Sequence, residues 1–197
     1  MENADARWAA CEHLRELLYY LDEDPEREGL RETPERAVRA LEFFTSGYKQ
    51  DPKQILKTFE DGASRVDEMV VQLNIPFWSM CEHHLLPFWG MAHIGYIPTT
   101  RIVGLSKLSR LVEIFARRLT VQEHLTVNIA EALLDGLGAR GVGVVMQARH
   151  SCMESRGIQK SGTVTVTSVM RGVFREKPET RAEFLALVNE AVVGKML

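Results

Sequence analysis

Two short clusters of cysteine and histidine are the residues most capable of metal chemistry. They are Cys81-Glu82-His83-His84 and His150-Ser151-Cys152. Sulfur and imidazole nitrogen are the ligands that zinc prefers, and Cys81 and His84 have the short spacing seen in zinc sites. Cys152 would complete the set from a distant part of the chain. The two clusters together favour a metal site over buried cysteines with hydrogen-bonded histidines.

The number of protein ligands would decide the role of that metal. Three ligands leave a position for water, whose pKa zinc lowers to about 7, and such a site is catalytic. His150 is available as a fourth ligand, which would close the site and make it structural. A disulfide between Cys81 and Cys152 is a third interpretation, which a reducing compartment disfavours.

Two further segments carry polar residues at the predicted start of a helix. Gly104-Leu105-Ser106-Lys107 has Arg110 one turn on, and a helix N-terminus beside basic side chains suits a phosphate group. Ser106 also fits an N-cap, which needs no ligand. Thr120-Val121-Gln122-Glu123 has the form of a capping box, which would account for Glu123 without any function.

Alternating residues predict the strands that position the two clusters. The odd positions of 69–83 are mostly apolar, which predicts a strand with one buried face, and Pro76 favours a bulge or an edge position in it. A second predicted strand, 142–152, ends in the other cluster. Cys81 and His84 would point to opposite faces of a flat strand, so the chain must bend between them for both to reach one metal.

The remaining pattern gives helices and strands in an order typical of an α+β fold. The other predicted elements are helices over 5–21 and 33–44, a strand over 88–97, two helices over 105–119 and 121–133, a strand over 162–174 and a short terminal helix. Thr33 is the expected N-cap of the second helix, and 48–65 is expected to be loop and short helix. We therefore expect an N-terminal helical region, 1–65, and a catalytic domain, 66–197.

Composition limits the class of protein and its compartment. The 197 residues are 45% hydrophobic and 26% charged, with a net charge of -3, which is ordinary for a globular chain and excludes a globally basic nucleic-acid binder. No apolar run is long enough to cross a membrane, and the N-terminus lacks the layout of a secretory signal. Three cysteines cannot all pair within one chain, so we expect a cytoplasmic protein without disulfides.

Taken in order, these motifs resemble those of GTP cyclohydrolase I. The resemblance is carried by 79–88, 104–110, 121–123, 150–153, 156–160 and 163–174. Its most specific part is the Cys-Glu-His-His block with the downstream His-x-Cys. The resemblance implies a zinc-dependent hydrolase that opens the guanine imidazole ring of GTP, releases formate and forms 7,8-dihydroneopterin triphosphate, the first step of tetrahydrofolate and pterin biosynthesis.

The resemblance also implies a role for each residue of these motifs. One zinc ion per subunit is held by Cys81, His84 and Cys152. Proton transfer falls to His83 and His150, and Ser106 assists opening of the ribose ring. The implied substrate contacts are Gln122 and Glu123 at the guanine edge, Lys107, Arg110 and Arg156 at the triphosphate, and Arg36 and Arg39 from a neighbouring subunit.

The family fold implied is the T-fold (tunnelling fold), an antiparallel four-stranded sheet packed by two helices, here with an N-terminal helical extension. The resemblance implies a homodecamer of two pentamers with sites at subunit interfaces, and no nucleic-acid or membrane partner. Free sheet edges independently favour pairing between subunits. The chain departs from the family pattern at His124, where arginine is expected, and at Glu154, which places a negative charge near Arg156.

Two other functions remain open on the sequence. One is a GTP-using relative that makes a different pterin product. The other is a zinc-stabilised protein that binds a purine nucleotide without turnover, which a fourth protein ligand on the metal would mark. A zinc nucleoside deaminase is disfavoured because its His-x-Glu and Pro-Cys-x-x-Cys signature is absent.

Overall fold

The computed structural model describes residues 2–60 and 65–193, which form two compact units. The first unit is Met1–Thr45 and the second is Ser46–Leu197. The described residues 46–60 and 65, which the sequence groups with the N-terminal region, therefore belong to the second unit. The expected division into an N-terminal region, 1–65, and a catalytic domain, 66–197, stays a prediction.

The N-terminal unit is a pair of helices, α1 (Glu2–Tyr20) and α2 (Thr33–Phe44). Both helices were predicted. Thr33 is not the N-cap of α2, however, but its first helical residue, because its N–H already donates to the Leu30 carbonyl at 2.9 Å in a preceding turn.

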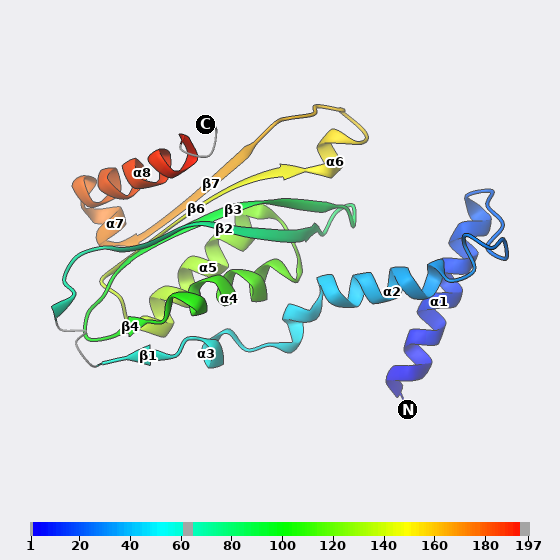
Figure 1. Cartoon of the computed structure of the whole chain (residues 1–197), viewed down its shortest axis with the longest axis horizontal. Helices are drawn as coiled ribbons and strands as arrows, with labels where there is room; N and C mark the ends of the chain where they lie inside the picture. Colours follow the sequence, from blue (N-terminus) through cyan, green and yellow to red (C-terminus); the bar gives the residue numbers. More distant parts are fainter. Residues whose placement is uncertain (1, 61–64, 194–197) are drawn as a thin grey trace. The chain divides into compact units, whose positions relative to one another are not determined.

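A five-stranded sheet forms the centre of the second unit (Figure 1). In spatial order its strands are β5 (Leu119–Thr120), β2 (Val70–Cys81), β3 (Pro87–Ile97), β6 (Gly141–His150) and β7 (Thr165–Gly172). The four long strands pair antiparallel, and the two-residue β5 runs parallel to the end of β2. The predicted α+β fold with a four-stranded antiparallel sheet is confirmed, and the sequence missed β5.

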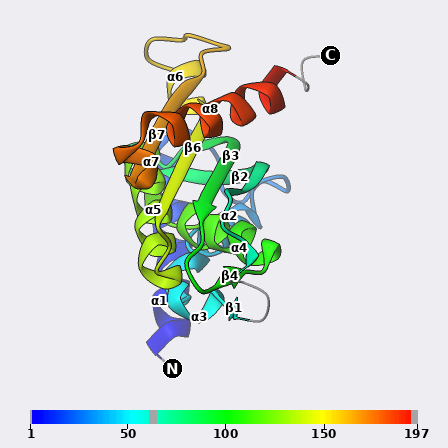
Figure 2. The same ribbon diagram turned by 90° about the vertical axis from the view of Figure 1, so that its left-hand side faces the viewer.

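Helices cover both faces of this sheet (Figure 2). On one face lie α4 (Leu105–Ala116) and α5 (Gln122–Leu137), whose Leu108 and Leu125 are fully buried in the larger core. On the other face lie α7 (Val173–Glu176) and α8 (Pro178–Val193), which bury a smaller cluster around Phe184. The two predicted helices that pack the sheet are confirmed as α4 and α5, and α8 is longer than expected.

Paired glycines let the smaller core form close to the sheet. Gly95 on β3 lies opposite Gly143 on β6. A Cβ at either position would come within 2.9 Å of the Phe184 ring, closer than side chains pack. The Phe184 ring therefore packs against the backbone of β3 and β6, where a residue with a side chain would displace it.

A bulge in β2 moves its side chains from one face of the sheet to the other. The pairing with β3 shifts between Gln72 and Ile75, and Asn74 has a φ of 57°. Leu73 packs in the cluster beneath α8, whereas Ile75 packs in the core against α4 and α5. The strand contains a bulge, but at Asn74 and not at Pro76, which pairs with Met91 in regular register. The prediction of one continuous buried face along this strand is wrong, because the extra residue reverses the alternation.

Short elements complete the second unit. They are a 3₁₀ helix η1 (Ser46–Lys49), α3 (Pro52–Ile55), and a two-stranded sheet of β1 (Thr58–Phe59) and β4 (Ile102–Val103). The expected short helix within 48–65 is confirmed, and residues 61–64 of that segment lie outside the described residues. Among the helices described, none has both the length and the apolar character needed to cross a bilayer.

Candidate metal centre and its surroundings

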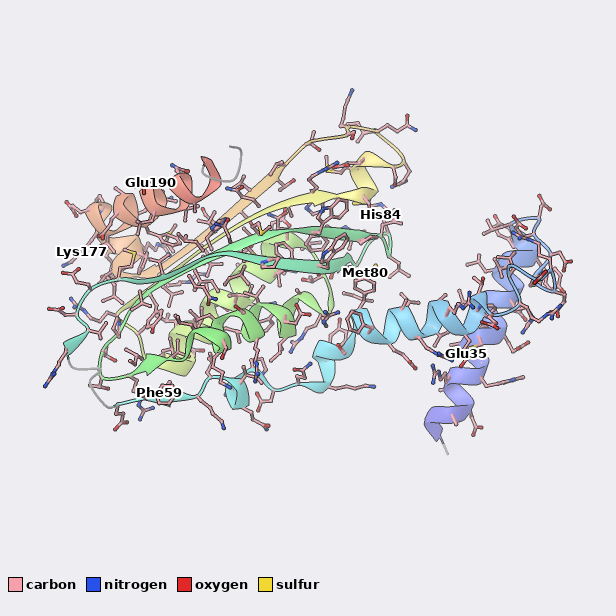
Figure 3. The ribbon with its side chains drawn as sticks, in the orientation of Figure 1. Glu35, Phe59, Met80, His84, Lys177 and Glu190 are labelled. Carbon is pink, nitrogen blue, oxygen red and sulfur yellow. The ribbon has the colours of Figure 1, made fainter. Side chains whose placement is uncertain are left out.

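A tight turn after β2 brings Cys81 and His84 to the same side of the chain. The Cys81 N–H donates to the Leu86 carbonyl at 2.9 Å, and the Leu85 N–H donates back to the Cys81 carbonyl at 2.9 Å. Leu85 has a φ of 52°, a left-handed conformation that reverses the chain within a few residues. The Cys81 Sγ and His84 Nδ1 atoms are consequently 3.6 Å apart, and Figure 3 labels His84 at this turn.

The third candidate ligand, Cys152, lies on a single helical turn, α6 (Ser151–Glu154). The strand predicted to run to residue 152 ends instead at His150, because Ser151 leaves the sheet and its hydroxyl donates to the Pro87 carbonyl at 2.5 Å. This bond ties the start of α6 to the start of β3. The change from strand to helix turns the Cys152 thiol toward the β2–β3 turn.

The donor atoms of Cys81, His84 and Cys152 all lie within 4.8 Å of one another. Tetrahedral zinc places sulfur and nitrogen ligands about 3.3–3.8 Å apart, so these side chains need only a small adjustment to share one ion. Among the described residues the group contains no fourth histidine, cysteine or carboxylate. Burial, then the neighbouring Cys81, raises the pKa of the Cys152 thiol, and a cation between the two sulfurs would reverse that effect. The donor set fits zinc.

His150 is held beside this group by a ring and an amide. Its imidazole stacks on Phe88 with ring centres 4.7 Å apart, and its Nε2 lies 2.8 Å from Oε1 of Gln122. Burial lowers the pKa of His150, while the charges of Glu123 and Glu154 act in the opposite direction. The ring is therefore positioned before any ligand binds.

Gln122 is buried, and its side-chain amide forms hydrogen bonds with other groups of the protein. Its Nε2 donates to the carbonyls of Met146 and Thr165 and to the Thr167 hydroxyl, at 3.0–3.2 Å. These acceptors fix which end of the amide is oxygen, so Oε1 accepts from Nε2–H of His150. The expected contact of the Gln122 side chain with a guanine edge is not favoured by this arrangement.

Three other predicted site residues surround the group. His83 is exposed in the β2–β3 turn, with its Nε2 3.8 Å from a carboxylate oxygen of Glu82. Glu123 is exposed at the start of α5, close enough for its charge to act on His150. Arg156 lies in the loop after α6 and acts electrostatically on the Cys152 thiol. All three present polar groups around the candidate metal centre.

The residues of α4 lie at the other end of the sheet. Ser106, Lys107 and Arg110 belong to the N-terminal part of α4, where Gln72 of β2 donates to Ser109 at 2.9 Å. From Gln72 to the metal group β2 extends nine residues, or about 25–30 Å at strand spacing. One chain therefore does not bring these residues to its own candidate metal centre. The N-cap of α4 is Gly104, so the expectation that Ser106 caps the helix is wrong.

Arg36 and Arg39 belong to α2 in the N-terminal unit. Arg36 pairs with Glu32, and Arg39 pairs with Glu35 at 2.5 Å, each one helical turn away. Both arginines are exposed.

Glu154 has a partner that the sequence did not predict. Its carboxylate receives two hydrogen bonds from Arg149, at 2.8 and 2.6 Å, so the negative charge expected to disturb Arg156 is already paired. The signal in the sequence is an arginine directly before His150, followed five residues later by an acid.

Comparisons with known proteins identify one family for most of the chain. The family model described as GTP cyclohydrolase I matches residues 10–189. A GTP cyclohydrolase 1 of Campylobacter lari is 54% identical over 90% of this chain and 93% of its own length. A GTP cyclohydrolase 1 of Nitrosospira multiformis is 55% identical over 96% of this chain and 98% of its own length.

Proposed function

The chain belongs to the GTP cyclohydrolase I family, and we propose that it opens the guanine imidazole ring of GTP by zinc-dependent hydrolysis. The products would be formate and 7,8-dihydroneopterin triphosphate, at the first step of tetrahydrofolate and pterin biosynthesis. The observation that carries this proposal is the group of two thiols and one imidazole, with no fourth protein ligand among the described residues.

Cys81, His84 and Cys152 would hold one zinc ion per subunit. When bound, zinc would supply a water acidic enough to deprotonate near neutral pH. A fourth position open to water separates this site from a closed structural one. His150, the candidate fourth ligand on the sequence, is not among the described residues whose donor atoms lie within 4.8 Å of one another.

Two histidines are suited to move protons around the reacting ring. Because Nε2–H of His150 donates to Gln122, the neutral ring carries its lone pair on Nδ1. His150 can therefore accept a proton at Nδ1 and return it in a later step. His83, exposed on the turn, would protonate the purine nitrogen that leaves carbon C8 when the ring opens.

Substrate contacts divide between the purine and the triphosphate. Glu123 would accept hydrogen bonds from the ring N–H and the exocyclic amine of guanine, a bidentate fit. Arg156 would contact the triphosphate from the same chain. We assign the Gln122 side chain to orienting His150 rather than to guanine.

The other predicted contacts would come from neighbouring subunits. The N-terminal part of α4, with Ser106, Lys107 and Arg110, is separated from Cys81 of its own chain by the length of β2, about 25–30 Å. A second subunit would therefore supply these residues, to bind phosphate and act on the ribose. Arg36 and Arg39 would come from a neighbouring subunit in the same way. This division supports a homo-oligomer with sites at its interfaces, for which we propose a decamer of two pentamers. The three cysteines, none in a disulfide, support a cytoplasmic location.

Incubation of the zinc-loaded protein with GTP tests the proposal. Formate and a pterin that becomes fluorescent on oxidation should appear in equal amounts. Formate without dihydroneopterin triphosphate would indicate a relative with a different product. GTP binding without either product would indicate a nucleotide-binding protein and overturn the proposed activity.

A further inference from the structure

A row of four side chains crosses the sheet and ends on the helix that carries Cys152. Trp78 on β2 pairs in register with Trp89 on β3, which pairs with Arg149 on β6. The indole rings stack with centres 5.0 Å apart and planes 16° from parallel. The guanidinium of Arg149 lies over the Trp89 ring at 5.6 Å. Glu154 on α6 completes what we call the Trp–Arg–Glu row.

The last contact of the row is its most specific. Nε and Nη2 of Arg149 donate to the two carboxylate oxygens of Glu154, a bidentate geometry that fixes both side chains. The Glu154 side chain is only 12% exposed. Glu154 therefore links α6 to β6.

α6 needs such contacts because it is too short to be stable alone. It has four residues, whereas isolated helices shorter than about 12–15 residues are marginal in water. Its first residue, Ser151, is fixed to β3 through the Pro87 carbonyl, and its last, Glu154, is fixed to β6 through Arg149. Cys152 lies between these two anchors.

We propose that the Trp–Arg–Glu row is a positioning device, which holds Cys152 at the distance where its thiol can share a metal ion with Cys81 and His84. A ligand that is ordered before binding loses less conformational entropy when the metal arrives, so the metal is bound more tightly. The two tryptophans restrain Arg149 in the orientation that reaches Glu154. This inference rests on the proposed metal site, and it assigns Arg149 and Glu154 as residues that act through Cys152.

Zinc affinity of the full-length protein, measured by competition with a chromophoric chelator, tests the inference. Glu154→Gln keeps the shape of the side chain and removes its charge, and we expect it to weaken zinc binding about tenfold, in the range typical of residues behind a metal ligand. Arg149→Met should do the same. The double variant should lose no more than either single variant, because both remove one contact. With cadmium, the thiolate charge-transfer band should weaken at equal metal loading.

Glu131→Gln is the matched control, since it breaks an exposed ion pair with Arg171 (3.2 Å) on another part of the sheet. Its zinc affinity should equal that of the wild type, and its urea midpoint without metal should match that of Glu154→Gln. Equal zinc affinity in Glu154→Gln and the wild type would overturn the inference. A parallel fall in affinity and metal-free stability would also overturn it, because the row would then be merely structural. If the wild type itself binds no zinc, the proposed function fails first.

Discussion

Each candidate metal ligand is held by a different local structure. Cys81 is the last residue of β2, His84 lies in the turn that follows, and Cys152 lies on the single turn α6. Because β2, β3 and β6 are packed between two hydrophobic cores, replacing one ligand removes a metal donor and leaves the fold of the sheet intact. Effects on metal binding can therefore be separated from effects on folding.

Cys152→Ser should remove both zinc and turnover while the helical content stays close to that of the wild type. A serine hydroxyl is a poor zinc ligand at neutral pH, and two remaining donors bind weakly. Elemental analysis, circular dichroism and the formate assay measure the three properties. His83→Ala is the control in the neighbouring turn: it should keep full zinc stoichiometry and lose turnover by about 10²–10⁴-fold, as expected for a proton-transfer group. Full zinc in Cys152→Ser would disprove the ligand assignment.

Gln122→Leu should lower kcat about 10- to 100-fold with little change in KM, because His150 would lose the acceptor that fixes its orientation. The buried carbonyls and hydroxyl that the amide contacts would also lose a donor, so the free energy of unfolding should fall by about 1–3 kcal/mol. Nitrogen NMR of His150 in the wild type should show the proton on Nε2. Asn128→Leu, on the exposed side of the same helix, should leave the kinetics unchanged. A wild-type proton on Nδ1 would contradict the assigned role.

At the scale of the elements, the bulge in β2 decides on which face of the sheet the side chains of its last residues lie. It sets the register so that Cys81 packs with the core under α4 and α5 while Leu73 serves the opposite core. Asn74 provides the required positive φ, and its N–H donates to Nδ1 of buried His93 at 3.3 Å. Asparagine tolerates this conformation better than most residues with a side chain.

Asn74→Val should lower the free energy of unfolding by about 1–3 kcal/mol, since a β-branched residue is strained at positive φ. Asn74→Gly should be close to the wild type, because glycine adopts this backbone freely. Urea unfolding measures both. Equal stability of the valine and glycine variants would show that the strand does not depend on this conformation.

The sequence predicts the long elements well and the local irregularities poorly. Helical stripes of apolar residues locate α4 and α5, because each helix buries a continuous face. Alternation does not reveal β5, whose two residues are too few for a pattern, or the one-residue shift in β2. It also extends β6 through Cys152, because the residues from 142 to 152 continue the alternation, while a single hydroxyl bond from Ser151 ends the strand. The candidate metal ligands can be predicted from their residue types. The role of Arg149 cannot, because it depends on the contact with Glu154 that the structure shows.

At the scale of the whole molecule, the predicted site residues fall into separate groups. The metal group, His150 and Glu123 lie at one end of the sheet, and the basic residues of α4 lie at the other. Within the described residues the sheet also has open edges, because β7 pairs only with β6 and β5 covers just the end of β2. Unpaired strand edges favour pairing with another copy of the chain. Both features support sites built from more than one subunit.

Complementation between two inactive variants tests that arrangement. Cys152→Ser and Arg110→Ala should each have little activity alone, but co-expression should restore about a quarter of the sites, those that draw both intact halves from different chains. The formate assay on the co-purified oligomer measures the recovery. The control is the double variant, Cys152→Ser with Arg110→Ala, expressed alone, which should stay inactive. No recovery in a verified mixed oligomer would place both groups of residues in one subunit.

X-ray absorption at the zinc edge of the purified, metal-loaded protein tests the central claim most directly. One zinc per chain should show two sulfur ligands at about 2.3 Å and two nitrogen or oxygen ligands at about 2.0 Å, and the spectrum should be unchanged in His150→Ala because the fourth ligand is water. Loss of a nitrogen ligand in His150→Ala, or a spectrum with fewer than two sulfurs, would contradict an open site held by Cys81, His84 and Cys152.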